Sequence, residues 1–155
     1  MVIIEPISKF KALFYTISTS AIRFITLWLW GGAVYYCIEL LWRQKSHPSM
    51  FILGGICFII LSFINKTFSW QMSIIVQVVL GAISIVLCEL IGGIIINILL
   101  GLHVWDYSHL KFNFLGQISL IYSILWIPIS AIGIFLDDFL RWKIFNEQAP
   151  RYSLR

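Results

Sequence analysis

Charged residues are scarce in this sequence. Only 12% of the 155 residues are charged, whereas 60% are hydrophobic and 16% are aromatic, and the mean hydropathy is +0.93. Soluble domains carry about 25% charged residues, so this composition excludes a water-soluble protein and predicts an integral membrane protein. The apolar runs occupy almost the whole chain and leave no room for a second, soluble domain. We therefore expect one membrane domain over residues 1–155, with the lipid bilayer as a partner.

The motifs of several enzyme classes are also missing. There is no G-x-x-x-x-G-K-S/T phosphate loop, nor even a Gly-Lys dipeptide, which excludes ATP hydrolysis by that route. The H-E-x-x-H and G-x-S-x-G motifs of zinc proteases and serine hydrolases are absent as well. Cysteine is rare, and Cys37, Cys57 and Cys88 all lie in apolar runs without a Cys-x-x-Cys pair, so we expect no disulfide. The sequence thus predicts no enzyme and no cofactor.

What the chain does contain is four apolar runs separated by short polar joints, at 24–42, 50–68, 73–102 and 114–136. Each is expected to be a helix, because a backbone exposed to lipid must satisfy its own hydrogen bonds. The sequence therefore predicts an all-α fold, a polytopic transmembrane bundle of about four spanning helices. As one helix the third run would measure about 45 Å, so it must tilt, project beyond the bilayer or break near Gly92-Gly93.

The ends of the chain and the basic residues indicate an orientation. Residues 1–23 are expected to form an N-terminal interfacial helix or an extension of the first span, and Glu5 and the late apolar run are not typical of a cleavable signal. Residues 137–155 are expected to be a cytoplasmic tail. In a four-span arrangement eight basic residues share one side and three the other: Lys9, Lys11, Arg23, Lys66, Arg141, Lys143, Arg151 and Arg155 against Arg43, Lys45 and Lys111. This bias predicts that both termini are cytoplasmic, and it accounts for the net charge of +4 without a nucleic acid partner.

Small and polar residues share one face of three of the expected helices. The faces are Trp28, Gly32, Tyr35 and Glu39 in the first, Gly81, Ala82, Glu89, Gly92, Gly93 and Asn97 in the third, and Ser119, Ser123, Trp126, Ser130, Gly133 and Asp137 in the fourth. Small residues let helices approach closely, so we expect these faces to meet inside the bundle, with Gly81, Gly92, Gly93, Ser123 and Ser130 at the contacts. Glu89 should then face protein and not lipid.

The intramembrane glutamates allow two interpretations. Glu89 and Glu39, with Asn97 and Gln117, could form a polar site for a cation, a proton or a cationic group. Alternatively, Glu39 is an ordinary helix partner of Arg43, and a protonated Glu89 bonds a neighbouring helix and is purely structural. The sequence leaves both open.

The loop between the third and fourth runs carries further polar side chains, namely His103, Asp106, His109, Asn113 and Gln117. Two histidines and one aspartate on a loop without a third fixed ligand are weak support for a metal, and we expect none. The loop is more simply explained by Trp105 and Tyr107 anchoring it at the membrane interface while Asp106 caps its turn.

An ordered series of short motifs resembles a known family. The stretches are GGICFIILSFIN, CELIGGIIIN, VWDYS, FNFLGQISL, SAIGIFLDDFLR and FNEQAPRY. Over roughly 31–152 they are similar to a family of small bacterial and phage-borne integral membrane proteins labelled type IV ABC-transporter permeases (CmpB-like). The resemblance implies a multi-pass location in the bacterial cell membrane and pattern positions at Glu89, Gly93, Asn97, Trp105, Asp106, Tyr107, Asn113, Gly116, Gln117, Asp137, Asp138 and Arg141. Lys111 departs from the pattern, because the family's loop is expected to carry proline there more often.

Two classes of function remain. The first is a permease- or channel-like subunit in which Glu89 and Asn97 line a polar path. It would be a homo-oligomer, because four short helices enclose little space, and an ABC permease would need a separate ATPase. The second is a non-transporting membrane protein that binds or scaffolds another membrane protein or lipid and uses the same faces for packing.

Overall fold

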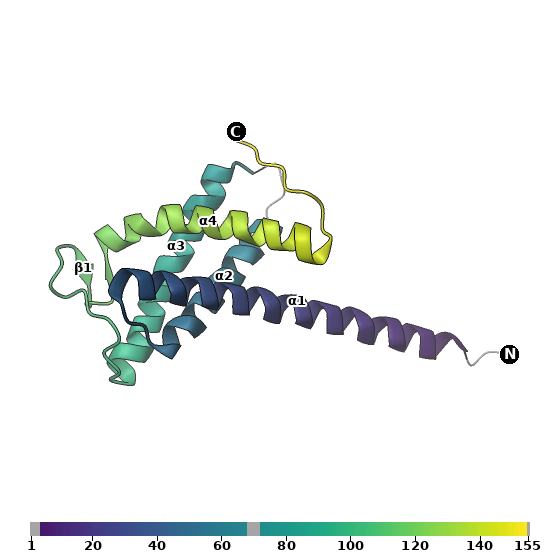
Figure 1. Ribbon diagram of the computed structural model, residues 1–155, viewed down its shortest axis with the longest axis horizontal. Helices are drawn as coiled ribbons and strands as arrows, with labels where there is room; N and C mark the ends of the chain where they lie inside the picture. The colour runs from purple at the N-terminus through teal and green to yellow at the C-terminus, as the bar shows by residue number, and fades with distance from the viewer. Residues whose placement is uncertain (1–3, 68–71, 155) are drawn as a thin grey trace.

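The computed structural model describes residues 4–67 and 72–154. Within them the chain forms a helical bundle, which confirms the predicted all-α membrane fold, with one two-stranded hairpin added. In chain order the elements are α1 Ile4–Arg43, α2 Pro48–Thr67, α3 Ile74–Gly93, the π-helix η1 Ile94–Leu99, β1 Asn113–Phe114, β2 Ile118–Ser119 and α4 Leu120–Phe145 (Figure 1).

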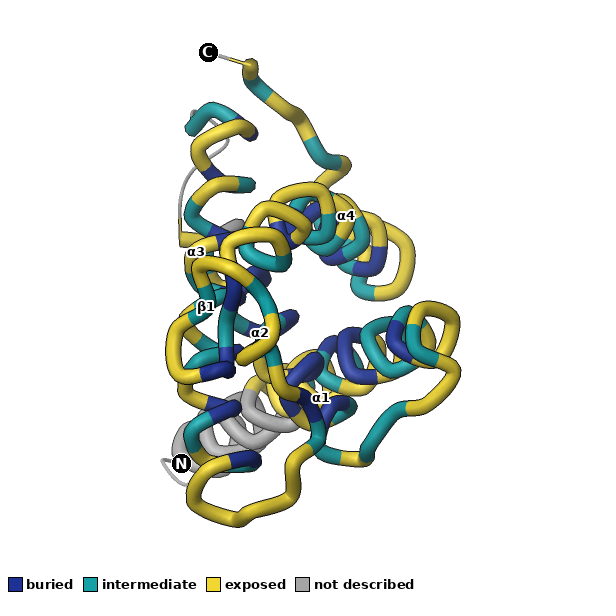
Figure 2. The backbone as a smooth tube through the Cα atoms, turned by 90° about the vertical axis from the view of Figure 1, so that its left-hand side faces the viewer, coloured by how far each residue is buried: buried dark blue, intermediate teal, exposed yellow. Residues whose placement is uncertain are grey.

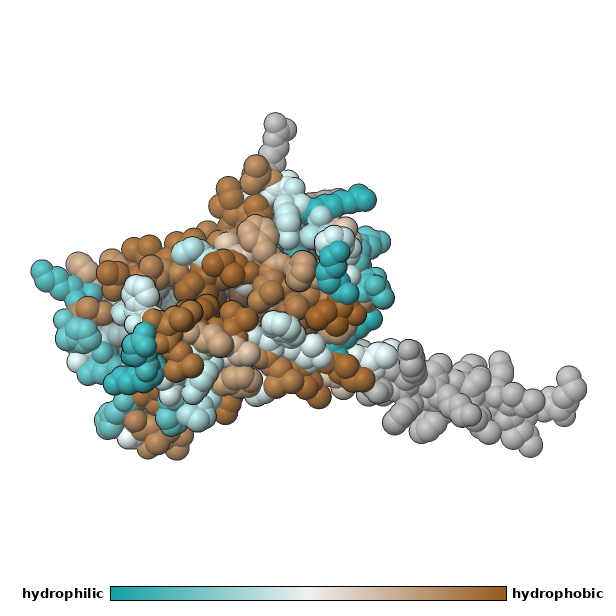
Figure 3. Space-filling view, viewed as in Figure 1, coloured by the Kyte–Doolittle hydropathy of each residue, from teal (hydrophilic) through white to brown (hydrophobic). Residues whose placement is uncertain are grey.

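The outer surface of the bundle is apolar. Among the described residues, three helical segments are long and apolar enough to cross a bilayer, at Thr19–Arg43, Ile74–Leu99 and Leu120–Phe145, while the apolar part of α2, Pro48–Ile64, is shorter. Large aliphatic side chains such as Leu41 are exposed on these helices. Figure 3 shows hydrophobic residues across the middle of one face and hydrophilic ones toward its two ends. Such a surface is stable in lipid and not in water, so the protein is a membrane protein.

α1 and α3 each adopt one of the alternative arrangements that the sequence allows. α1 runs without interruption from Ile4 to Arg43, so residues 4–23 extend the first span; 40 residues give a helix about 60 Å long. α3 does not break at Gly92-Gly93, because Gly93 and Ile94 both have helical backbone angles and the helix continues as η1.

The fourth helix begins and ends later than the sequence indicated. Residues of the run 114–136 first form an antiparallel hairpin, in which β1 pairs with β2 across Leu115 and Gly116, at φ 53° and 68°. α4 then continues nine residues past position 136 to Phe145, so the expected tail 137–155 begins inside a helix. The helix ends where Asn146 adopts the left-handed conformation, which asparagine tolerates better than most residues.

The helices pack in an order that leaves α1 and α4 largely apart. α1 packs along α2, and α4 packs on α3 and α2, whereas α1 and α4 touch at few points. Figure 2 shows α4 above α1, with α2 and α3 alongside. The close approach of α1 and α2 requires glycine at Gly54, where a Cβ atom would lie 2.5 Å from the Cβ of Tyr35. The space between α1 and α4 positions the site described below.

The connecting segments gather at two ends of the molecule. At one end the Nη2 of Arg43 lies 3.5 Å from the carbonyl oxygen of Val104, which brings the end of α1 to the segment 100–119. We call this the loop end. At the other end the amide of Ile74 donates to the carbonyl of Ser153 (2.8 Å), and Arg23 pairs with Glu147 (3.1 Å). We call this the tail end.

Candidate intramembrane site

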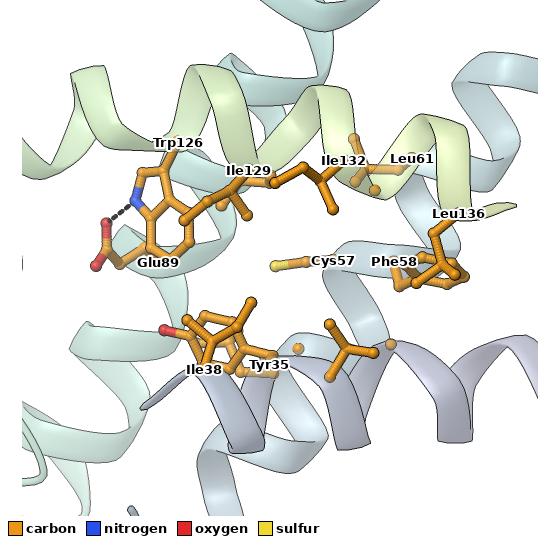
Figure 4. Close-up of a pocket in the computed structure, with 16 residues that line it drawn as sticks. Tyr35, Ile38, Cys57, Phe58, Leu61, Glu89, Trp126, Ile129, Ile132 and Leu136 are labelled. Atoms are coloured by element: carbon orange, nitrogen blue, oxygen red, sulfur yellow. Dashed lines mark hydrogen bonds between the residues drawn. The ribbon is translucent and has the colours of Figure 1, made fainter. Parts of the chain in front are cut away.

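Glu89 lies inside the protein and accepts hydrogen bonds from two other elements. Its side chain projects from α3 and is buried. The hydroxyl of Tyr107, in the loop, donates to Oε1 at 3.0 Å, and the Nε1 of Trp126, on α4, donates to Oε2 at 2.8 Å (Figure 4). Both donors are held in place by aromatic packing: Tyr107 stacks on Tyr122, with centroids 4.5 Å apart, and Trp126 packs on Tyr35. The carboxylate is therefore fixed in position.

A cavity of about 70 Å³ lies beside Glu89, between all four helices. In Figure 4, Tyr35 and Ile38 of α1 face Trp126 and Ile129 of α4 across this space, and the sulfur of Cys57 points into it. The remaining wall is almost wholly apolar. Glu89 is thus a carboxylate at the edge of an apolar chamber, within a helical segment long and apolar enough to cross a bilayer.

A second cavity, of about 460 Å³, adjoins the first toward the loop end. The two share five lining residues: Tyr35, Ile38, Trp126, Ile129 and Ile132. We call the two together the α1–α4 cleft. Its wider part is lined by polar groups as well, namely Glu39, Arg43, Asp106, Tyr107 and His109. The cleft therefore runs from a polar mouth at the loop end to Glu89 and on to an apolar inner part.

Glu39 lies at the mouth of the cleft and is already paired. Its Oε1 lies 2.5 Å from the Nη2 of Arg43, one turn further along α1, and the hydroxyl of Ser46 donates to its other oxygen. The Nε of Arg43 is buried and has no hydrogen-bond partner within residues 4–67 and 72–154. The two glutamates thus occupy adjoining parts of one cleft.

Asn97 and Gln117 form a separate hydrogen-bonded cluster, which reaches the wall of the cleft only through Trp105. The Nδ2 of Asn97 donates to the Oε1 of Gln117 at 2.8 Å, and its Oδ1 accepts from the amide of Val104 at 2.7 Å. Gln117 completes the cluster, because its Nε2 donates to the carbonyl of Leu115 and its own carbonyl accepts from the Nε1 of Trp105. Neither amide lines either cavity of the cleft. The cluster ties the loop to η1, and only Glu39 and Glu89 of the four expected site residues share a cleft.

The loop is folded by its own polar side chains. Asp106 accepts from the amide and the hydroxyl of Ser108, at 2.8 and 2.9 Å, and these bonds, the backbone one foremost, lower the pKa of that exposed carboxyl. Asn113 donates to the carbonyls of Ser108 and Leu110 and accepts from the amide of Gly116. Asp106 therefore caps a turn at the mouth of the cleft.

The expected interfacial role of Trp105 is wrong. Its ring is 4% exposed and packs with Met50 and Leu53 inside the bundle, where its Nε1 finds the carbonyl of Gln117. The loop folds back onto the helices, and a buried indole is satisfied there by one acceptor. His103 and His109 are exposed, and across the described ranges no three His, Cys, Asp or Glu side chains lie close enough together to hold a metal ion.

Most of the expected packing residues lie at contacts between elements. A Cβ on Gly81 would meet the Oγ of Ser130 at 2.2 Å, and Ser130 itself donates to the carbonyl of Val78 at 3.0 Å. Gly92 faces Leu53, and Gly93 faces Gln117. Ser123 differs, because its hydroxyl donates to the carbonyl of Ser119, four residues earlier in the chain. The glycines of α3 thus permit its close approach to α4, α2 and the loop.

Sequence reasoning missed the two donors that hold Glu89. Trp126 was on the expected inner face of the fourth helix, yet nothing in its spacing indicated Glu89 as its acceptor. Tyr107 was expected only to anchor the loop. The sequence contains one indication of such donors, namely the absence of a basic residue near Glu89, because a buried carboxylate without a cation needs neutral hydrogen-bond donors.

Comparisons with known proteins bear on the family. Searches of curated proteins and of solved structures returned no match. A family model described as "Putative ABC-transporter type IV" matches residues 26–149, a range that contains every residue lining the cleft. The chain therefore belongs to the ABC-transporter type IV family that this model describes.

Proposed function

We propose that this protein is a permease-like subunit that holds its ligand in the α1–α4 cleft. The observation that carries the proposal is the continuity of the cleft from a polar mouth to a carboxylate at membrane depth. Faces used for packing alone would be filled by side chains, because protein interiors are close-packed. A cleft that remains open beside Glu89 is what a transported ligand would need.

The chemistry of the walls indicates the class of ligand. Glu89 supplies the negative charge, because Glu39 is paired with Arg43, and each oxygen of Glu89 can accept one more hydrogen bond besides those from Tyr107 and Trp126. The rest of the lining is largely apolar and aromatic, from Ile38, Ile129 and their neighbours. A ligand with a cationic group on an apolar body satisfies both, and aromatic rings favour such cations further.

Partners and orientation complete the proposal. Because the chain has no phosphate loop, energy from ATP would come from a separate ATPase subunit. Several copies would assemble, since a single bundle of this size encloses only a small cleft. The eight-to-three distribution of basic residues favours both termini in the cytoplasm of a bacterial cell, with the loop end outside.

The second candidate is a non-transporting membrane protein that uses Glu89 structurally. It is favoured by one observation, that both oxygens of Glu89 already accept hydrogen bonds from other elements. In that case the two hydrogen bonds to Glu89 serve to join α3, α4 and the loop. A ligand-binding measurement separates the two candidates.

The test is binding of tetraphenylphosphonium, a lipophilic cation, to the purified protein in nanodiscs. Glu89→Gln keeps the size of the side chain but removes its charge, and we expect it to weaken binding about tenfold or more, the cost of losing a charged partner. Glu147→Gln makes the same change at the tail end and should leave binding unaltered. Binding that is absent in the wild type, or equal in wild type and Glu89→Gln, would favour the structural candidate.

A further inference from the structure

A second site lies at the tail end, away from the cleft. Three cationic side chains from three helices line one cavity of about 250 Å³: Arg23 of α1, Lys66 of α2 and Arg141 of α4. Two hydroxyls, of Ser20 and Ser62, line it as well. Side chains of like charge repel one another, so their convergence needs a compensating anion.

The carboxylates of the protein compensate this charge incompletely. Arg141 pairs with Asp137 through Nε at 2.9 Å and with Glu147 through Nη1 at 3.3 Å, and it also donates to the hydroxyl of Ser62. Arg23 shares the same Glu147, at 3.1 Å. Lys66 forms no ion pair with any residue in 4–67 or 72–154. Three cations thus face two carboxylates, and Glu147 is divided between two guanidinium groups.

An apolar groove adjoins this basic cavity. It has a volume of about 470 Å³ and lies between α1 and α2. It shares Phe24, Ile59 and Phe63 with the basic cavity. The groove is lined by Phe24, Ile25, Trp28, Leu29, Ile56, Ile59, Ile60 and Phe63, with no polar side chain other than the Trp28 indole. A polar chamber therefore continues directly into a hydrocarbon-lined one.

We propose that this composite site binds one anionic phospholipid, with its phosphate at Arg23 and Lys66 and an acyl chain in the groove. Charge complementarity selects an anion, and the groove selects one that carries a hydrocarbon chain. A free phosphate ion would leave the groove empty. A zwitterionic lipid would bring its own cation toward three others. The site is independent of the α1–α4 cleft and of the function proposed for it.

The test measures lipid binding by the purified full-length protein, using native mass spectrometry and phosphatidylglycerol, phosphatidylcholine or inorganic phosphate as probes. We expect phosphatidylglycerol to bind and phosphatidylcholine to bind at least tenfold more weakly. Inorganic phosphate in excess should not displace the lipid. Equal binding of the two lipids, or displacement by phosphate, overturns the proposal.

Two variants and one control locate the lipid. Lys66 is exposed and forms no ion pair with a carboxylate among the described residues, so the Lys66→Gln protein should fold normally. The substitution should weaken phosphatidylglycerol binding about fivefold, which is the effect of one basic residue near a membrane surface. Ile56→Trp fills the groove without changing charge and should weaken it as well. Lys45→Gln removes a charge at the loop end and should have no effect. The site is contradicted if the Lys66→Gln and Lys45→Gln proteins bind phosphatidylglycerol equally well. It is also contradicted if the Ile56→Trp protein binds this lipid as the wild type does.

Discussion

At the scale of single residues, the cost of burying a carboxylate explains the surroundings of Glu89. A polar group withdrawn from water is destabilising unless it is hydrogen-bonded, and within a bilayer no water replaces a lost partner. Trp126 and Tyr107 supply one bond to each carboxylate oxygen. Buried polar groups at the loop end are paired in the same way, since Asn97 and Gln117 form hydrogen bonds with each other and with the nearby backbone.

The Trp126 bond can be removed while an aromatic ring is kept at this position. Trp126→Phe deletes the Nε1 donor and leaves Oε2 of Glu89 with one partner fewer, so we expect the free energy of unfolding to fall by about 0.6–2 kcal/mol, the usual range for bonds between membrane helices, in addition to the loss of ring packing. Thermal unfolding in detergent, followed by circular dichroism, measures this. Trp142→Phe, at an exposed ring on the same helix, is the control. An equal fall in the control would mean that the bond to Glu89 contributes nothing.

At the scale of elements, glycines determine how closely α3 approaches its neighbours. Gly81 lies against Ser130 and Leu61, and Gly92 lies against Leu53. Helices in lipid gain little from hydrophobic association, so close packing of small residues is a main source of their affinity. Asn97 lies in η1, where its side chain is buried and accepts a hydrogen bond from the loop.

Substitution at Gly81 should separate α3 from α4. In Gly81→Ala the new Cβ would lie 2.2 Å from the Oγ of Ser130, a distance that forces one side chain or helix to move. We expect the free energy of unfolding to fall by about 1–3 kcal/mol, as for other overpacked sites. The same thermal unfolding measurement applies.

A second substitution identifies the cause of that loss. Ser130→Ala removes the hydroxyl that meets the new methyl group, so the Gly81→Ala/Ser130→Ala protein should be more stable than the sum of the two single changes predicts. Strict additivity would place the strain elsewhere, for instance at Leu61, whose Cδ2 would lie 2.6 Å from the same Cβ.

At the scale of the whole molecule, the two ends carry different chemistry. The loop end holds the mouth of the cleft, with Glu39 and Asp106, and the tail end holds the basic cavity, with Arg23 and Lys66. An anionic inner leaflet attracts basic residues, which agrees with placing the tail end in the cytoplasm. The cleft mouth would then face outside.

This orientation is testable with single introduced cysteines. His109→Cys and Gln148→Cys place exposed thiols at the loop end and in the tail. In intact cells a charged, impermeant maleimide should label the first, and should label the second only after the membrane is permeabilised. The wild-type protein is the background control, since its three cysteines lie within the helices. Labelling of Gln148→Cys but not His109→Cys in intact cells would reverse the orientation.

The sequence by itself determined the features that depend on local composition. Low charge and long apolar runs predicted a helical membrane bundle, because the bilayer accepts few other structures, and the ordered motifs indicated the family to which the chain belongs. The alignment of Gly81 with Glu89 on one helix face followed from a period of 3.6 residues.

Only the tertiary structure decided which groups meet. Tyr107 and Trp126 stand 18 and 37 positions from Glu89, and nothing in local spacing specifies a contact over such intervals. The same is true of Asn97 and Gln117, which the sequence grouped with Glu89 and which the folded chain pairs with each other, outside the lining of the cleft. The cleft exists because α1 packs on α2 and leaves α4 apart, a consequence of side-chain packing summed over the whole bundle that no single segment encodes.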